Sequence, residues 1–171
     1  MEEKDFCYFG NKRFFKVLNA ANYKNGYEYE DGLNDMSNII GADGEPFVCF
    51  FTDIKHIFAY LDYGPCFREV FIPDNMPIIF EAGESFGPGY PYIPGYYSRK
   101  VILGEVMPWT VNNIKYLIEN GADISVNKYN IVKWALMYNF EVFYYLQEYI
   151  YDKDPSIWDA IINDLQLRGF L

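Results

Sequence analysis

The sequence has few of the residues on which metal sites and disulfide frameworks depend. Its 171 residues include one histidine, His56, and three cysteines. The cysteine count is odd, and no two cysteines have the CxxC spacing of a zinc or redox motif. We therefore expect reduced, partly buried thiols, no metal site and no cofactor.

Basic residues and long apolar runs are also scarce. The chain has 14 Lys and Arg residues and 24 Asp and Glu residues, which gives a formal net charge of −10. Because phosphate groups are bound by basic patches, this balance argues against nucleic acid and anionic membranes as partners. No stretch approaches the ~20 apolar residues of a membrane-spanning helix. The opening MEEKDFCYFG has no secretion-signal pattern, so we expect an intracellular protein.

Apolar material is plentiful in spite of this acidic charge. Hydrophobic residues make up 51% of the chain and aromatic residues 20%, with 17 tyrosines. Such a composition argues against intrinsic disorder and supplies enough apolar surface for a sizeable core.

The first part of the chain, residues 1–107, has the pattern of a small β domain. Its short apolar runs are bounded by Gly, Pro and Asp residues, which is typical of strands. Apolar residues at helical spacing from Ile54 to Leu61 follow a possible cap at Thr52 or Asp53. The pattern predicts a small mixed β-sheet with one short helix. The strand-length runs are Phe14–Leu18, Phe47–Phe51, Phe67–Ile72, Ile78–Phe80 and Val101–Leu103.

The segment GPGYPYIPGYY, residues 87–97, combines three prolines with three glycines and four tyrosines. This content argues against a central strand or a helix. One interpretation is a tyrosine-rich recognition loop, since exposed tyrosines suit interfaces. The other is a proline-stiffened connection whose tyrosines lie on the core.

The last part, residues 108–171, is predicted to be helical. Apolar residues recur at helical spacing over residues 110–120, 128–138, 140–149 and from residue 155 onward. Thr110 and the Asp154-Pro155 pair are suitable helix starts, and Gly169 is a suitable end. Together the two parts predict the α+β class.

One stretch of the helical part resembles a known repeat. IKYLIENGADISV, at Ile114–Val126, is similar to the second helix and exit turn of an ankyrin repeat, with Gly121 as the left-handed cap. Residues 127–148 resemble the next helix pair. The TPLH motif is replaced by IVKW, and the Tyr-Leu pair at Tyr116 recurs after 29 residues instead of ~33. The resemblance therefore implies degenerate repeats followed by a capping helix.

So short a repeat array cannot stand alone. Each repeat hides its apolar face against a neighbour, and about three repeats are needed for a stable stack. We therefore divide the chain into an α+β domain at 1–107 and helical repeats at 108–171, and expect the first to cover the exposed face of the second.

The whole layout also resembles the ankyrin-like proteins of giant DNA viruses in the mimivirus group. The similar stretches are GYEYEDGLN at 26–34, LDYG at 61–64, REVFIP at 68–73 and RKVILGE at 99–105. Because that family is largely uncharacterised, the resemblance implies little about activity. It implies the host cytoplasm as the location, with the virion as a second possibility.

The favoured hypothesis is a nonenzymatic module that binds a host or viral protein. Its surface would be the concave face of the repeats together with the aromatic segment at 90–97. We select large aromatic residues at turns or element edges as contacts, namely Tyr90, Tyr92, Tyr96, Trp109 and Tyr129. The oligomeric state stays open, and a structural role in the virion is a third possibility.

The competing hypothesis is a small enzyme or ligand-binding domain in residues 1–107. Its pocket would be lined by Cys49, Asp53, His56 and Glu69, because thiolate attack needs a nearby base. The spacing of these residues does not place them in contact. For His56, which lies off the apolar face of its helix, an ordinary surface position is the simpler interpretation.

Overall fold

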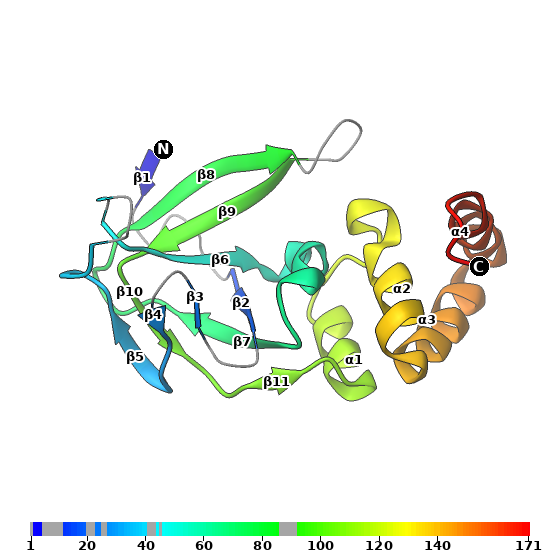
Figure 1. The fold of residues 1–171 in the computed structure, drawn as a ribbon, viewed down its shortest axis with the longest axis horizontal. Coiled ribbons are helices and arrows are strands. Elements are labelled where there is room, and N and C mark those ends of the chain that lie inside the picture. Colours follow the sequence, from blue (N-terminus) through cyan, green and yellow to red (C-terminus); the bar gives the residue numbers. More distant parts are fainter. Residues whose placement is uncertain are drawn as a thin grey trace.

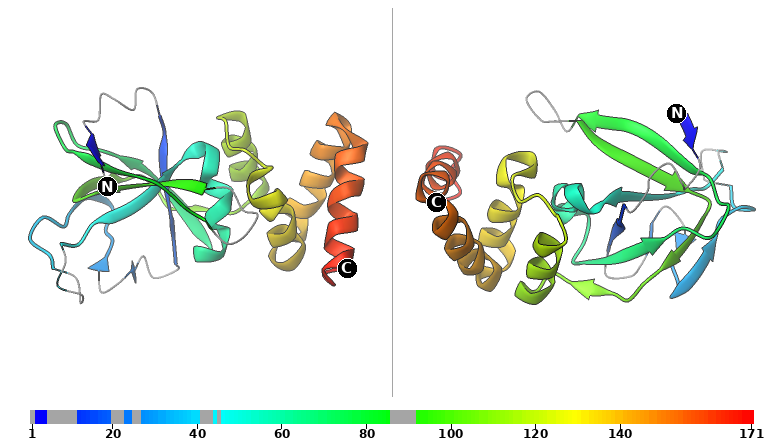
Figure 2. Two further views of the ribbon diagram at one scale, coloured as in Figure 1. Left: turned by 90° about the horizontal axis from the view of Figure 1, so that it is seen from above. Right: turned by 180° about the vertical axis from the view of Figure 1, so that it is seen from behind.

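The computed structural model describes residues 2–4, 12–19, 23–24, 27–40, 44, 46–85 and 92–171. Strands occupy one end of the molecule and α-helices the other, as seen in Figure 1 and from two further sides in Figure 2. Between them lies a short helix, η2 (Ile54–Tyr63), drawn in teal. The predicted α+β class is confirmed.

The sheet of the described residues has nine strands in the order β1-β8-β9-β6-β2-β7-β10-β5, with β11 beside β7. Every pairing is antiparallel, so the expectation of a mixed sheet was wrong. A separate pair is formed by β3 (Tyr23–Lys24) and β4 (Tyr27–Glu28). The nine strands are β1 (Glu2–Lys4), β2 (Phe14–Leu18), β5 (Gly32–Asp35), β6 (Cys49–Asp53), β7 (Cys66–Phe71), β8 (Ile78–Ser85), β9 (Tyr92–Ser98), β10 (Lys100–Leu103) and β11 (Met107–Pro108).

The aromatic segment is not a loop throughout, because its second half forms β9 between β8 and β6. Pro94 is tolerated there for a geometric reason. It stands at a register shift on the β8 side, between the pairs Glu81↔Gly95 and Glu84↔Ile93. On the β6 side it lies beyond Phe51↔Tyr96, the last pair. A missing N–H at this point therefore removes no ladder hydrogen bond.

Alternate residues of β2 face two different cores. Phe15 packs with Phe67 in the larger core, which also includes residues of η2 and of all four α-helices. Phe14 and Leu18 belong to a second core on the opposite face of the sheet, with Cys49. The larger core, which we call the shared core, therefore joins the strand part to the helical part.

The helix η2 has 3₁₀ geometry over ten residues, where α-helical spacing had suggested an α-helix. Asp53 precedes it in extended conformation but makes no side-chain capping bond. Its carboxylate is instead hydrogen-bonded to His56 and Tyr96. Ile57, Phe58 and Leu61 of η2 are buried in the shared core.

The helical part has four helices: α1 (Val111–Glu119), α2 (Val126–Tyr138), α3 (Phe140–Lys153) and α4 (Pro155–Leu167). The predicted starts are confirmed: Thr110 accepts from the Asn113 N–H, and Asp154 accepts from the Ser156 N–H. Gly121, at φ 105°, ends α1 in the left-handed region, as expected.

Hydrogen bonds to backbone carbonyls attach the helices to η2 and the turn after it. The indole Nε1 of Trp109 donates to the Gly64 carbonyl at 2.9 Å, and the Asp123 N–H donates to the Lys55 carbonyl at 3.1 Å. Gly64 has no room for a side chain, since a Cβ there would lie 1.9 Å from the Leu18 oxygen. Close approach of the turn to β2 thus positions the acceptor for Trp109.

We predict that Trp109→Ala lowers the free energy of unfolding by about 3–5 kcal/mol, because it opens a cavity in the shared core. Trp109 is 3% exposed, and its ring centroid lies 4.5 Å from that of Phe67. Urea denaturation measures the effect. Ile102→Ala, at a side chain 37% exposed, is the control and should cost less than ~1 kcal/mol. Equal losses in the two variants would contradict the role given to Trp109.

Candidate functional site: a groove at the start of α2

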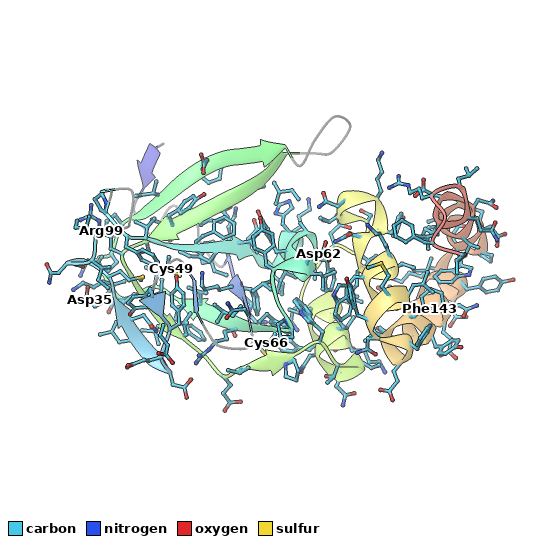
Figure 3. All side chains as sticks on the ribbon, in the orientation of Figure 1. Asp35, Cys49, Asp62, Cys66, Arg99 and Phe143 are labelled. Atoms are coloured by element: carbon cyan, nitrogen blue, oxygen red, sulfur yellow. The ribbon has the colours of Figure 1, made fainter. Side chains whose placement is uncertain are left out.

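Two adjoining cavities surround the first turn of α2. One, of ≈ 310 Å³, lies between η2, α2 and the end of α4, and its lining includes Asp62, Asn127 and Arg168. The other, of ≈ 330 Å³, is lined by Tyr129 and by residues of α4. Both share Lys128, Asp164 and Leu165, so we treat them as one feature, the α2–α4 groove. Figure 3 labels Asp62, on the side of η2 that faces the helices.

Part of the backbone that lines this groove is strained. Asn127, Lys128 and Tyr129 have φ values of 52°, 56° and 60°, so three consecutive non-glycine residues are left-handed. Each such residue costs roughly 1–2 kcal/mol relative to right-handed backbone. Among the described residues, the buried Oδ1 atom of Asn127 has no hydrogen-bond partner. Strained backbone is concentrated at functional sites in proteins, and a buried polar atom without a partner needs a structural explanation.

The two halves of the α2–α4 groove differ in chemistry. The half near η2 is polar and carries Lys128, Lys133 and Arg168 together with Asp62 and Asp164; Arg168 Nε lies 2.9 Å from Asp164 Oδ2. The other half is mainly apolar and is lined by Tyr129, Ile157, Ala160, Ile161 and Leu165. This arrangement can hold an apolar side chain beside a segment of polar backbone.

The structure describes the side chains of three of the five predicted contact aromatics. Tyr129 lines the groove. Tyr96 is fully buried, with its ring centroid 4.9 Å from that of Phe14, and Trp109 is buried in the shared core, so neither is an exposed contact. Tyr96 occupies an inward position of β9, and Trp109 follows β11 directly. Tyr90 and the side chain of Tyr92 lie outside the described residues.

The competing pocket is not assembled as expected. Cys49 begins β6 and Asp53 ends it, roughly 13 Å apart along the strand. Figure 3 shows Cys49 in the part of the sheet away from the helices.

Glu69 stands opposite Phe15, whereas Asp53 stands opposite the adjacent Phe14, so the two carboxylates point to opposite faces. Glu69 forms a two-pronged ion pair with Arg13, at 2.8 Å for each bond.

Asp53 and His56, by contrast, do meet. His56 Nδ1 lies 2.8 Å from Asp53 Oδ1, and its side chain is only 20% exposed, so the expectation of an ordinary surface histidine was wrong. The Tyr96 hydroxyl donates to Asp53 Oδ2 at 3.3 Å and accepts from Lys12 Nζ at 2.8 Å. This cluster orients the imidazole, and Lys12 balances the charge of a buried carboxylate at the start of η2.

The pKa of Asp53 reflects this environment. Burial raises the pKa, but the hydrogen bond and charge of His56, together with the charge of Lys12, outweigh burial. The pKa of Asp53 is therefore lower than its ordinary value. The cluster stabilises the ionised carboxylate and, through it, the junction between β6 and η2.

The sequence did not predict that two cationic side chains would be buried. Lys16 and Arg68 are register partners on β2 and β7 and are both almost fully buried. Lys16 Nζ donates to the Phe50 carbonyl at 3.0 Å and lies 4.5 Å from the Tyr29 ring centroid. Arg68 Nε donates to the Gly104 carbonyl at 2.7 Å, and its Nη2 bonds to Asp31. The only signal was position, since Lys16 stands in the apolar run FFKVL.

Neither a metal centre nor a membrane span emerges from the described part of the chain. In those residues, no group of three or more His, Cys, Asp or Glu side chains is arranged to hold a metal ion. Within the same ranges, none of the helices combines the length and the apolar character needed to cross a bilayer.

Comparison with known proteins gives relatives from Acanthamoeba polyphaga mimivirus. The chain is 30% identical over 134 residues to a protein that carries the name ankyrin repeat protein R868, which covers 76% of this chain and 63% of the relative. It is 28% identical over 132 residues to the uncharacterised protein R869, which covers 73% and 89% respectively. A third relative, named as ankyrin repeat protein R838, is 29% identical over 103 residues, or 55% of this chain and 37% of that protein.

The chain is therefore related to the mimivirus proteins that carry the ankyrin repeat name, as the sequence resemblance implied. It spans less than two thirds of the length of R868 and of R838. No protein-family model matches it. No solved structure matches it either.

The Asp53 cluster predicts a specific pH dependence. A carboxylate whose pKa is lowered by folding stabilises the protein above its unfolded pKa, near 3.9, and loses this contribution as pH falls through the folded value. The free energy of unfolding of the wild type should therefore fall more between pH 6 and pH 3 than that of Asp53→Asn. Urea denaturation at each pH measures this. Asp74→Asn, at an exposed site, should keep the wild-type slope. Parallel curves for Asp53→Asn and wild type would show that the ionised carboxylate of Asp53 does not stabilise the fold.

Proposed function

We propose that the protein is a nonenzymatic interaction module that binds a segment of another protein in the α2–α4 groove. The observation that carries this proposal is the strained left-handed turn at Asn127–Tyr129, which stands in the wall of the groove and has an unpartnered buried amide oxygen. Strain of this kind persists only where surrounding structure enforces it, and it is concentrated where ligands are held. The ankyrin repeat names of the relatives agree with an interaction role.

The arrangement of the helices supports a degenerate ankyrin stack. In this interpretation α1, ended by Gly121, is the second helix of one repeat, and α2 and α3 are the helix pair of the next. The first helix of the first repeat is replaced by η2, which packs against α2 and accepts a hydrogen bond from Asp123 through Lys55. The strand domain thus provides the neighbour that a short array needs.

On this interpretation the groove runs along the first-helix side of the stack. An apolar side chain of the partner would enter the half lined by Tyr129 and Ile161, beside the left-handed turn. The partner is a host or a viral protein, met in the host cytoplasm or the virion.

Blocking the groove tests this proposal. Peptides displayed from viral and host proteins would be selected on the wild type, and their affinities measured by fluorescence anisotropy. Ala160→Arg, at an exposed position that lines the groove, should weaken the selected peptides at least tenfold. Gln166→Arg adds the same charge to an exposed position of α4 outside the groove lining and should leave binding unchanged.

Two results would overturn the groove as the binding site. One is a set of selected peptides that bind Ala160→Arg and wild type equally well. The other is a selection that returns no peptide with measurable affinity for the wild type.

A further inference from the structure

A second surface, independent of the groove, lies on the solvent side of α3. Phe140, Tyr144 and Tyr151 are exposed by 61%, 61% and 51%, although all three are large aromatic residues. At 3.6 residues per turn, their spacing places them within about 40° of one another around the helix and over ~16 Å of its length. We call this row the α3 stripe.

The stripe is not a core face left open by the helix packing. The opposite side of α3 carries Val142, Leu146 and Ile150, which are buried in the shared core. Burial of one side is sufficient to fix α3, since α1, α2 and α4 all pack against this helix. Three exposed aromatic rings in line therefore contribute little to the fold, and an exposed apolar row of this kind is typical of an interaction site.

An aromatic hollow lies at the beginning of the stripe. It has a volume of ≈ 670 Å³, and its lining includes Trp109, Trp134, Tyr138 and Asn139, the residue directly before α3. Tyr138 is itself 65% exposed, and its ring centroid lies 6.1 Å from that of Trp134. A pocket of this kind beside an aromatic row can anchor a large apolar side chain.

Carboxylates line one flank of the stripe. Glu141, Glu148 and Asp152 are exposed, and helical spacing places all three on the same side of the aromatic row. The chain as a whole has a net charge of −10. Two copies that met through this face would bring these carboxylates together, which disfavours a dimer. An anionic membrane is disfavoured too, because helices that lie on membranes have basic flanks.

We propose that the α3 stripe is a docking surface for a cationic amphipathic helix of a partner protein. The apolar face of that helix would cover Phe140, Tyr144 and Tyr151. Its lysines or arginines would pair with Glu141, Glu148 and Asp152 and contact the aromatic rings. The apolar row supplies affinity and the acidic flank selects a basic partner.

A model peptide tests this surface directly. The probe is a fluorescent helical peptide of about 18 leucines and lysines, with leucine confined to one face. Fluorescence anisotropy should show binding to the wild type that weakens as salt increases. The double variant Phe140→Ser, Tyr144→Ser keeps the net charge and should weaken binding at least tenfold. Phe71→Ser, at an exposed side chain on β7, should leave binding unchanged.

Charge is tested by a second pair of variants. Glu141→Gln with Glu148→Gln should weaken binding severalfold and reduce its salt dependence. Asp74→Asn with Glu105→Gln removes the same charge at exposed positions away from α3 and should change the affinity much less. Circular dichroism and urea midpoints establish that each variant is folded.

Two binding results would overturn the proposal: no binding of the peptide by the wild type, or equal losses of affinity in the stripe and control variants. A third is a wild-type dimer in sedimentation that is absent in the double variant. The Ala160→Arg variant should bind the probe as the wild type does, so failure of the groove proposal and failure of this one are distinguishable.

Discussion

The structure depends on the burial of one apolar cluster shared by the sheet and the helices. Phe15 and Phe67 enter it from the sheet, Phe58 from η2, and Trp134 and Leu146 from α2 and α3. The four α-helices bury their apolar side chains in this cluster, and so does one face of the sheet. The short 3₁₀ helix between them joins the two parts, because its buried residues belong to the same cluster.

This dependence explains where the binding surfaces fall. Many large aromatics are buried inside the cores, including Tyr96 and Trp109, whereas three of the exposed rings lie in a row on α3. The α2–α4 groove forms where α2 begins against η2, so its left-handed turn is kept in place by the same packing. Two surfaces of different chemistry therefore lie on the helical part, one a groove and the other a row of rings with an acidic flank.

Local patterns predicted most of the elements and few of the site residues. The caps at Thr110 and Asp154 and the left-handed Gly121 follow from side chains acting on their own backbone, so sequence alone identified them. The strand through Pro94 could not be predicted, because a register shift in its neighbour makes the proline harmless. The Asp53–His56 contact and the burial of Arg68 depend on tertiary packing, which no spacing encodes.

Equilibrium unfolding of the whole chain in urea shows whether the sheet and the helices form one folding unit. Tryptophan fluorescence reports the helical part, where all three tryptophans lie. Labelling of the buried thiols Cys49 and Cys66 reports the sheet. We predict a single transition with the same midpoint for both probes. Two separated midpoints, with tryptophan fluorescence changing while these thiols stay protected, would show that the helices unfold independently of the sheet.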